Sequence, residues 1–293
     1  MRALAALHRP DELEHLLDLL GEHGDAAKIV AGGTAFTILW RAGLIQAEHL
    51  VSVTGVVGLA GVTENDGVLT IGALTRLRDV ERADATRKGC PVLGAALRLV
   101  ANVRVRNVAT MGGNVAEADY TSDPPAILTA LDATVTIRSK SGEREMPLRE
   151  FLVDYFETAL HPDEFVTRVT VPTLPPEWSG TYLKLLSRSA EDRTCLGVAA
   201  FVRRGEDDTC TGVRVAVVGA NPVPLRLPEI EDSFVGQDFG TASLESFAAE
   251  YAAATDPVED NRGSASYRRR IISPLIVRSL RRAARGSKDA VFA

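Results

Sequence analysis

The stretch that decides the fold is VRVRNVATMGGNVAEADYTSD, residues 103–123. It opens with a short alternating run and passes through Thr110 into two adjacent glycines, Gly112 and Gly113. Adjacent glycines let main-chain N–H groups approach a ligand closely, and a loop of such groups makes an anion-binding concavity. With the Thr110 hydroxyl and with Asp123, which can hold a ribose or ribityl hydroxyl, the loop suits the diphosphate and sugar of a nucleotide cofactor. Taken alone, the glycine pair is equally well explained as a turn between two elements.

A second glycine pair lies upstream, in KIVAGGTAF at residues 28–36. A short apolar run leads into Gly32 and Gly33, and the threonine after them opens a helix predicted over 35–42. This is the layout in which the free N–H groups and partial positive charge of a helix N-terminus hold a phosphate. The two loops together therefore predict one diphosphate held from two sides.

Four segments carry a resemblance that spans nearly the whole chain. They read AGGT at 31–34, TIGALTRLRDVE at 70–81, VRNVATMGGNVAEADYTSDPPAILTALDA at 105–133 and DNRGSASYRRRIISPLIVRSLRRA at 260–283. In this order they resemble the FAD-binding subunit of the molybdenum hydroxylases, a family that includes the xanthine dehydrogenases and the medium subunit of aerobic carbon monoxide dehydrogenase. The resemblance implies an α+β fold. A two-subdomain FAD-binding domain of the vanillyl-alcohol-oxidase/PCMH type (1–174, divided at about 1–55 and 56–174) precedes a C-terminal antiparallel sheet covered by helices (175–293).

The residue patterns predict an order of elements compatible with that fold. Apolar periodicity and turn residues predict helices at 10–20, 35–42, 74–83, 92–100, 124–131, 244–254 and 264–285. They predict strands at 28–31, 49–53, 134–139, 143–147, 163–171, 181–187, 196–203 and 212–218, and a hairpin at 59–72 that turns at Asn65-Asp66-Gly67. Three prolines within 172–178 mark the domain boundary. The sequence GVVGLAG at 55–61 has the spacing GxxGxxG and not GxGxxG, which argues against a nicotinamide-binding Rossmann domain.

The resemblance also implies a set of FAD contacts. In the first loop and the run before it, these are Lys28, Ile29, Val30, Ala31, Gly32, Gly33, Thr34, Ala35 and Phe36. In the second segment they are Ala109, Thr110, Gly113, Asn114, Ala116, Ser122 and Asp123. Packing near the cofactor is implied for Val100, Ala101 and Val105, and later contacts for Val166 and Lys184. Family members often carry a polar residue where this chain has Ala35, so one side-chain contact is missing there.

Two of the candidate residues carry alternatives. Lys184 lies on a predicted strand and is either a solvated lysine or a cation beside the pyrimidine edge of the flavin, where it would stabilise negative charge on the ring. Tyr120 stands where the family commonly has proline. It is either an aromatic of a surface loop or a ring lying against the isoalloxazine.

Cysteine and histidine usage argues against a metal centre in this chain. The three cysteines, Cys90, Cys195 and Cys210, have no CxxC spacing, so they do not supply the four ligands of an iron–sulfur cluster and indicate buried free thiols rather than disulfides. The five histidines form no HExxH or paired-ligand pattern. We expect no metal site here, and no catalytic nucleophile–base pair, so the chemistry is expected to be that of the flavin.

The distribution of charge and the hydropathy of the chain restrict which partners and which cellular location are expected. The segment from 261 onward holds nine Lys or Arg and one acid, a balance of +8, whereas the rest of the chain carries −14. An acidic body repels a phosphate backbone, so the basic segment is expected to pair with the chain's own acids or a partner subunit and not with nucleic acid. No apolar run is long enough to span a membrane, and Pro10 comes too early for a secretory signal, so the expected location is cytoplasmic.

The function implied by the resemblance is electron transfer within a complex. FAD on this chain would receive electrons from the [2Fe–2S] clusters of a small subunit, after a large molybdopterin subunit hydroxylates the substrate, and pass them to NAD, a quinone, oxygen or a carrier protein. Relatives suggest a dimer of heterotrimers. Two alternatives are a stand-alone FAD-dependent reductase or oxidase and an FAD-less structural module. The sequence names neither the substrate nor the acceptor.

Overall fold

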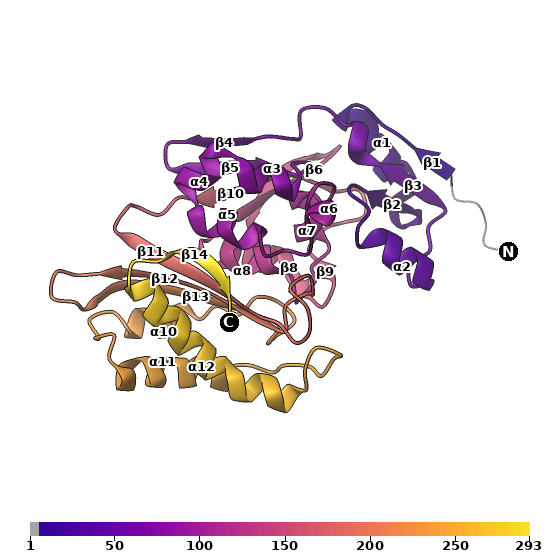
Figure 1. Cartoon of the computed structure of the whole chain (residues 1–293). Coiled ribbons are helices and arrows are strands. Elements are labelled where there is room, and N and C mark those ends of the chain that lie inside the picture. The colour runs from indigo at the N-terminus through magenta and orange to yellow at the C-terminus, as the bar shows by residue number, and fades with distance from the viewer. Residues whose placement is uncertain (1–5) are drawn as a thin grey trace.

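The computed structural model describes residues 6–293 and begins with a small parallel sheet (Figure 1). Residues 1–5 lie outside the described residues. They belong to the N-terminal stretch for which the sequence predicts no secretory signal. The N-terminal unit contains β1 (Ala6–His8), α1 (Leu13–His23), β2 (Ala27–Val30), α2 (Phe36–Ala42) and β3 (His49–Ser52), with the strand order β1-β3-β2. Leu16, Leu17 and Leu20 of α1 are buried in the same core as Val51 of β3. The predicted alternation of strands and helices in this unit is confirmed.

A five-stranded antiparallel sheet forms the middle of the molecule, with the order β4-β5-β10-β6-β7. Its strands are β4 (Val62–Asn65), β5 (Val68–Gly72), β6 (Thr134–Ser139), β7 (Gly142–Pro147) and β10 (Phe165–Pro172). The helices of this region are α3 (Leu77–Arg82), α4 (Asp84–Gly89), α5 (Pro91–Leu97), α6 (Val103–Arg106), α7 (Met111–Ala116), α8 (Asp123–Ala130) and α9 (Leu148–Phe151). Two short strands, β8 (Leu152–Asp154) and β9 (Glu157–Thr158), pair with each other.

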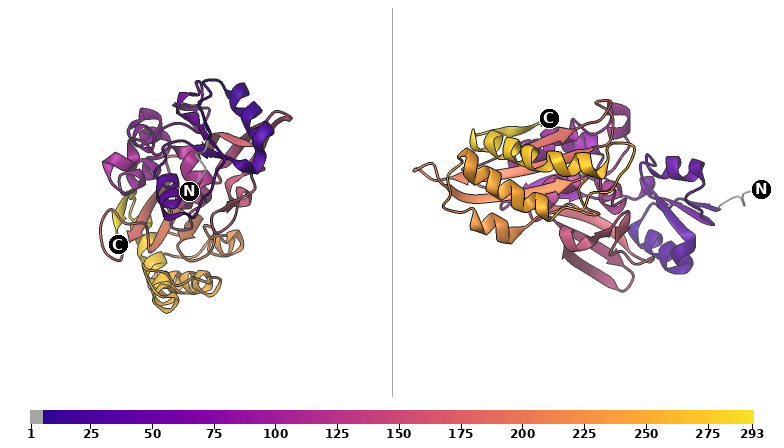
Figure 2. Two further views of the ribbon diagram at one scale, coloured as in Figure 1. Left: turned by 90° about the vertical axis from the view of Figure 1, so that its right-hand side faces the viewer. Right: turned by 90° about the horizontal axis from the view of Figure 1, so that it is seen from below.

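The C-terminal part is a four-stranded sheet buried on both faces. It contains β11 (Trp178–Leu185), β12 (Leu196–Arg204), β13 (Cys210–Val218) and β14 (Lys288–Phe292), in the order β13-β12-β11-β14. The helices α10 (Pro228–Ser233), α11 (Thr241–Ala253) and α12 (Ala265–Ala284) follow β13 in the chain. Of these, α11 and α12 lie side by side across one face (Figure 2), and α5 and α8 contact the other. Because side chains alternate along a strand, Leu183 belongs to the core under α12, whereas Tyr182 belongs to the core shared with α8.

Several local predictions are wrong. The alternating run at the start of 103–123 forms helix α6, and Gly112 and Gly113 lie inside helix α7 and not in a loop. The sequence also missed the strands β1, β8, β9 and β14 and the helices α4, α9 and α10. Strand β14 pairs with β11 in parallel, so the otherwise antiparallel C-terminal sheet gains a parallel edge. The expected mixed fold, in which an N-terminal half of two subdomains precedes a C-terminal sheet covered by helices, is confirmed.

Among residues 6–293, no helix is both long enough and apolar enough to cross a membrane. The basic C-terminal segment pairs partly with the chain's own acids. In α12, Arg268 contacts Asp260 and Arg269 contacts Asp256, and Arg282 contacts Asp289 of β14.

Candidate cofactor site

The two glycine segments, about 80 residues apart in the sequence, meet in space. A β-carbon placed on Gly32 would stand 2.0 Å from the carbonyl oxygen of Val108, at the entrance to α7. A β-carbon on Gly113 would lie 3.8 Å from the side chain of Ala31. The predicted convergence of the two segments is confirmed, and it depends on the absence of a side chain at Gly32.

A pocket of about 670 Å³ lies where these segments meet. Its size falls within the range of roughly 300–1,000 Å³ that is common for ligand and cofactor sites. The candidate residues in its wall are Lys28, Ile29, Val30, Ala31, Gly32, Gly33, Thr34, Ala35, Phe36, Ala109, Thr110, Gly113, Asn114, Ala116 and Val166. The structure thus brings fifteen of the twenty-two candidate residues into one pocket wall.

The first glycine loop offers unpaired main-chain donors to this pocket. Gly33 has φ +68°, a left-handed conformation that glycine adopts without strain. Within residues 6–293, no hydrogen bond uses the main-chain N–H of Gly32, Gly33, Thr34 or Ala35 as donor. Successive N–H groups of this kind, beside the start of α2, form a concavity suited to an anion.

The second glycine pair, Gly112 and Gly113, does not supply the free main-chain N–H groups that the sequence predicted. The N–H of Gly112 donates to Ala73 O at 2.8 Å, and that of Gly113 donates to Thr110 Oγ1 at 3.2 Å. Main-chain donors were expected from both glycine pairs, and for this pair the expectation is wrong. Gly112 instead allows close packing, since a β-carbon there would stand 2.5 Å from the Ala73 side chain. Thr110 is the N-cap of α7 and fixes the start of that helix.

Asn114 is held in position by Ser122, another candidate residue. Its Nδ2 donates to Ser122 Oγ at 2.9 Å, and the Ser122 hydroxyl is 3.1 Å from Asn114 Oδ1. Asn114 lies in the pocket wall, whereas Ser122 does not. Ser122 therefore orients an amide that faces the pocket.

Asp123 and Lys184 are brought together, but outside the pocket wall. Lys184 Nζ donates to Asp123 Oδ2 at 2.8 Å and to Leu99 O at 2.8 Å, and Lys184 is only 1 % exposed. The hydroxyls of Tyr182 and Thr194 both donate to Asp123 Oδ1. Burial and the charge of Asp123 raise the pKa of Tyr182 well above its usual value, so this hydroxyl stays a donor. Of the two alternatives for Lys184, the solvated lysine is excluded, because β11 lies in a sheet that is covered on both faces.

The loop that Lys184 holds contains further candidate residues. Ala101 has φ +43°, a left-handed conformation unfavourable for a residue with a β-carbon. Arg106 Nη1 donates to Val100 O at 2.8 Å and to Ala101 O at 3.3 Å, and its Nε contacts Glu81. Val100, Ala101 and Val105 are partly buried and lie outside the pocket wall. Such a backbone persists only where its surroundings fix it, and here Lys184 and Arg106 do so.

Tyr120 joins the two halves of the chain. Its hydroxyl donates to Asp260 Oδ2 at 2.6 Å, and its ring packs edge-on against Tyr155. Burial and this hydrogen bond raise the pKa of Tyr120. Tyr120 is partly buried and does not line the pocket, so the structure favours neither a free surface aromatic nor a ring in the pocket wall.

Sequence reasoning missed part of the wall. The additional residues are Leu39, Leu44, Ile45, Ala73, Leu74, Gly112, Glu117, Phe156, Leu160, Glu164 and Phe165. Most of these are apolar residues on elements with no motif of their own. Ala73 and Leu74 could have been predicted, because they belong to the segment 70–81 that carries part of the family resemblance. Glu164 is fixed by a bidentate contact from Arg144 at 2.7 Å.

The three cysteines are buried free thiols, as expected. Burial raises the pKa of the Cys90 thiol to about 12, which keeps it protonated. Three of the five histidines, His8, His23 and His49, show no ligand spacing in the sequence but come together in the N-terminal unit.

The geometry fits a flavin dinucleotide. It combines a cradle that a β-carbon would fill at Gly32, a run of unpaired main-chain donors and an apolar wall large enough for a planar ring. Comparisons with known proteins agree. Residues 3–174 match the family described as the FAD binding domain in molybdopterin dehydrogenase, and residues 181–283 match the CO dehydrogenase flavoprotein C-terminal domain.

Individual relatives match over nearly their full length. The chain is 34% identical to the 6-hydroxypseudooxynicotine dehydrogenase complex subunit alpha of Paenarthrobacter nicotinovorans, covering 96% of each protein. It is 28% identical to the carbon monoxide dehydrogenase medium chain of Hydrogenophaga pseudoflava, covering 93% of this chain and 94% of that one. A solved carbon monoxide dehydrogenase from Hydrogenophaga pseudoflava, which lacks the Mo-pyranopterin moiety, superimposes with a TM-score of 0.93 at 28% identity, covering 98% and 99% of the two chains.

Proposed function

Because this chain belongs to the family of FAD-binding subunits of molybdopterin dehydrogenases, we propose that it holds FAD in the pocket between its two glycine segments. The observation that carries this proposal is the contact of Gly32 with Val108, which closes the first glycine loop onto the start of α7. The main-chain donors of 32–35 would hold the diphosphate. Asn114, oriented by Ser122, would supply a side-chain amide.

When bound, FAD would supply the redox chemistry, accepting electrons from [2Fe–2S] clusters of a partner subunit and releasing them to an external acceptor. The residues of this chain bind and orient it. Lys184 and Asp123 fix the loop at 99–101 through Leu99 O. We propose Lys184 as a positioning residue whose charge also favours negative charge on the flavin ring.

The proposed assembly contains two kinds of partner: a small [2Fe–2S] subunit and a large molybdopterin subunit, arranged as a dimer of heterotrimers. Exposed apolar side chains support a covering partner, because Leu44 and Phe156 line the pocket and yet are 74 % and 53 % exposed. Within this chain we propose a flavin-binding domain over 1–174 and a C-terminal domain over 175–293. The cytoplasmic location remains a prediction.

Purification of the full chain, alone and with candidate partner subunits, tests the function. The proposal expects a yellow protein with about one FAD per chain that reacts slowly with NADH alone and co-purifies with an iron–sulfur subunit. A colourless chain that takes up no FAD would favour the structural module. A lone chain that oxidises NADH rapidly and binds no partner would favour the stand-alone reductase.

A further inference from the structure

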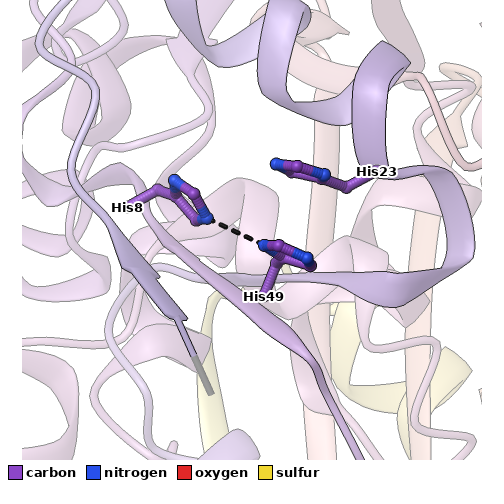
Figure 3. A group of neighbouring side chains, drawn as sticks. All are labelled: His8, His23 and His49. Carbon is purple, nitrogen blue, oxygen red and sulfur yellow. Dashed lines mark hydrogen bonds between the residues drawn. The ribbon is translucent and has the colours of Figure 1, made fainter.

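Three histidine side chains from three separate elements meet in the N-terminal unit (Figure 3). His8 is the last residue of β1, His23 the last of α1 and His49 the first of β3. His8 Nε2 and His49 Nδ1 are 3.0 Å apart, and the ring of His23 stacks on that of His49 with a centroid distance of 3.7 Å. One ring nitrogen from each residue lies within 4.8 Å of the other two.

Three converging imidazoles are a ligand set for a divalent transition metal. Zinc takes neutral imidazole nitrogens at about 2.0–2.1 Å in a tetrahedral arrangement, which separates ligand nitrogens by about 3.3 Å. The observed limit of 4.8 Å therefore needs side-chain movements of roughly 1.5 Å. Because a metal lies in the plane of each ligating ring, His23 must turn from its stacked position. All three residues are half-buried, so solvent can reach the cluster.

The cluster is poorly explained by packing alone. Within residues 6–293, the ring of His23 makes no hydrogen bond and contacts the other two only through ring faces. The C-terminal end of α1, where His23 lies, carries a partial negative charge that favours a cation.

The cluster is separate from the cofactor pocket. His49 pairs with Ala27 at the start of β2, whereas Gly32 follows the end of the same strand. None of the three histidines lines the pocket. An ion bound here would connect β1, α1 and β3 and so stabilise the N-terminal unit.

We propose that His8, His23 and His49 form a binding site for one divalent transition-metal ion of the zinc class, with a fourth position open to water. The sequence-based expectation of no metal site in this chain is thereby revised. The site is independent of the proposed flavin function.

Metal titration of the full chain tests the proposal. The protein is purified without a polyhistidine tag, treated with a chelator and titrated with Zn²⁺ against a chromophoric competitor. The wild type is expected to bind one ion per chain. His8→Gln, His23→Gln and His49→Gln are each expected to weaken binding by on the order of 100-fold, since even the loss of a partner of a ligand costs about 10–100-fold.

The matched control is His15→Gln, which removes an exposed histidine from the same helix α1. It is expected to leave Zn²⁺ affinity unchanged. The proposal is overturned if the wild type shows no saturable binding, if the three cluster variants bind as the wild type does, or if His15→Gln loses binding equally.

Thermal unfolding provides a readout that does not depend on the variants folding equally well. Zn²⁺ should raise the Tm of the wild type and of His15→Gln, because an ion that binds only the folded state stabilises it. It should not raise the Tm of the cluster variants. An unchanged wild-type Tm at saturating Zn²⁺ would contradict the proposal. FAD content, measured in the same samples, reports on the flavin function separately.

Discussion

The main chain of Gly32 lies so close to Val108 that a β-carbon at Gly32 would stand 2.0 Å from the Val108 carbonyl oxygen. Real β-carbons essentially never come within 3.0 Å of such a neighbour. The β-carbon would clash with main-chain atoms of Val108, so no change of side-chain rotamer would relieve the clash. This contact positions the unpaired donors of the first glycine loop beside α7, and the proposed flavin site depends on it.

Removal of the α7 cap should weaken the fold modestly. Thr110 Oγ1 accepts from the N–H of Gly113, and loss of such an N-cap costs about 1 kcal/mol. Thr110→Ala should lower the free energy of unfolding by that amount, measured by urea denaturation. Thr110→Ser keeps the acceptor and should behave nearly as the wild type. Equal losses in both variants would argue against a capping role.

Breaking the buried ion pair between Asp123 and Lys184 should lower the free energy of unfolding far more than loss of the Thr110 cap does. Asp123→Asn leaves Lys184 charged, 1 % exposed and without its counter-charge, for which the typical cost is about 3–5 kcal/mol. The double variant Asp123→Asn/Lys184→Met removes both charges and should recover part of this loss. Urea unfolding of the single and double variants gives the coupling energy. Strictly additive losses would show that the pair is not coupled.

The charge of Lys184 should also affect a bound flavin. Lys184→Met removes a cation and should lower the midpoint potential of the flavin or loosen FAD, because negative charge on the ring loses its support. Lys184→Arg keeps the charge and serves as the control. A redox titration at full FAD occupancy that finds the same potential in Lys184→Met and the wild type would contradict an effect of the Lys184 charge on the flavin.

Asp260 should make stability depend on acid pH. Burial acts to raise the pKa of Asp260, but hydrogen bonds from Arg268, Tyr120 and Arg262 outweigh it and hold the pKa well below its usual value. A lowered folded-state pKa contributes stability above the unfolded value of about 3.9, and that stability is lost as the pH falls toward the folded value.

The wild type should therefore exceed Asp260→Asn in unfolding free energy by on the order of 3 kcal/mol at pH 7. The difference should shrink below about pH 4. Urea unfolding at pH 7, 5, 4 and 3 measures it, with Asp163→Asn as a control at an exposed position. A difference in unfolding free energy between the wild type and Asp260→Asn that stays constant from pH 7 to pH 3 would contradict the lowered pKa of Asp260.

Local patterns were sufficient for much of the fold. The leucines of α1 recur at helical spacing and are buried on one face. Asn65-Asp66-Gly67 predicted a hairpin turn, and Asp66 and Gly67 have the positive φ angles, 50° and 76°, that such a turn requires. These elements carry their information within a few residues.

Elements fixed by distant contacts could not be predicted in the same way. Glycines disfavour helices, so Gly112 and Gly113 indicated a loop. The Thr110 cap and the close packing of Gly112 on Ala73 override that preference. Strand β14 follows the long helix α12 and pairs with β11, more than 100 residues earlier in the chain.

The residues of the candidate site likewise divide into those that local sequence marks and those that only tertiary contacts bring together. Glycine pairs mark the pocket, because their conformational freedom and small size are local properties. The partners of Lys184 lie on α8 and in the loop after α5, and the burial of both faces of its sheet is a tertiary fact. His8, His23 and His49 have no motif spacing, and only the parallel pairing of β1 with β3 under α1 brings them together.

FAD binding to the Gly32→Ala variant is the most direct test of the central claim. Gly21→Ala is the matched control, since a β-carbon there has no neighbour within 4 Å. Overpacking typically costs about 1–3 kcal/mol, so Gly32→Ala should weaken FAD binding by about 10- to 100-fold, whereas Gly21→Ala and the wild type should each bind one FAD per chain with equal affinity. Equal FAD affinity in Gly32→Ala and the wild type, measured by flavin fluorescence titration, would contradict the account.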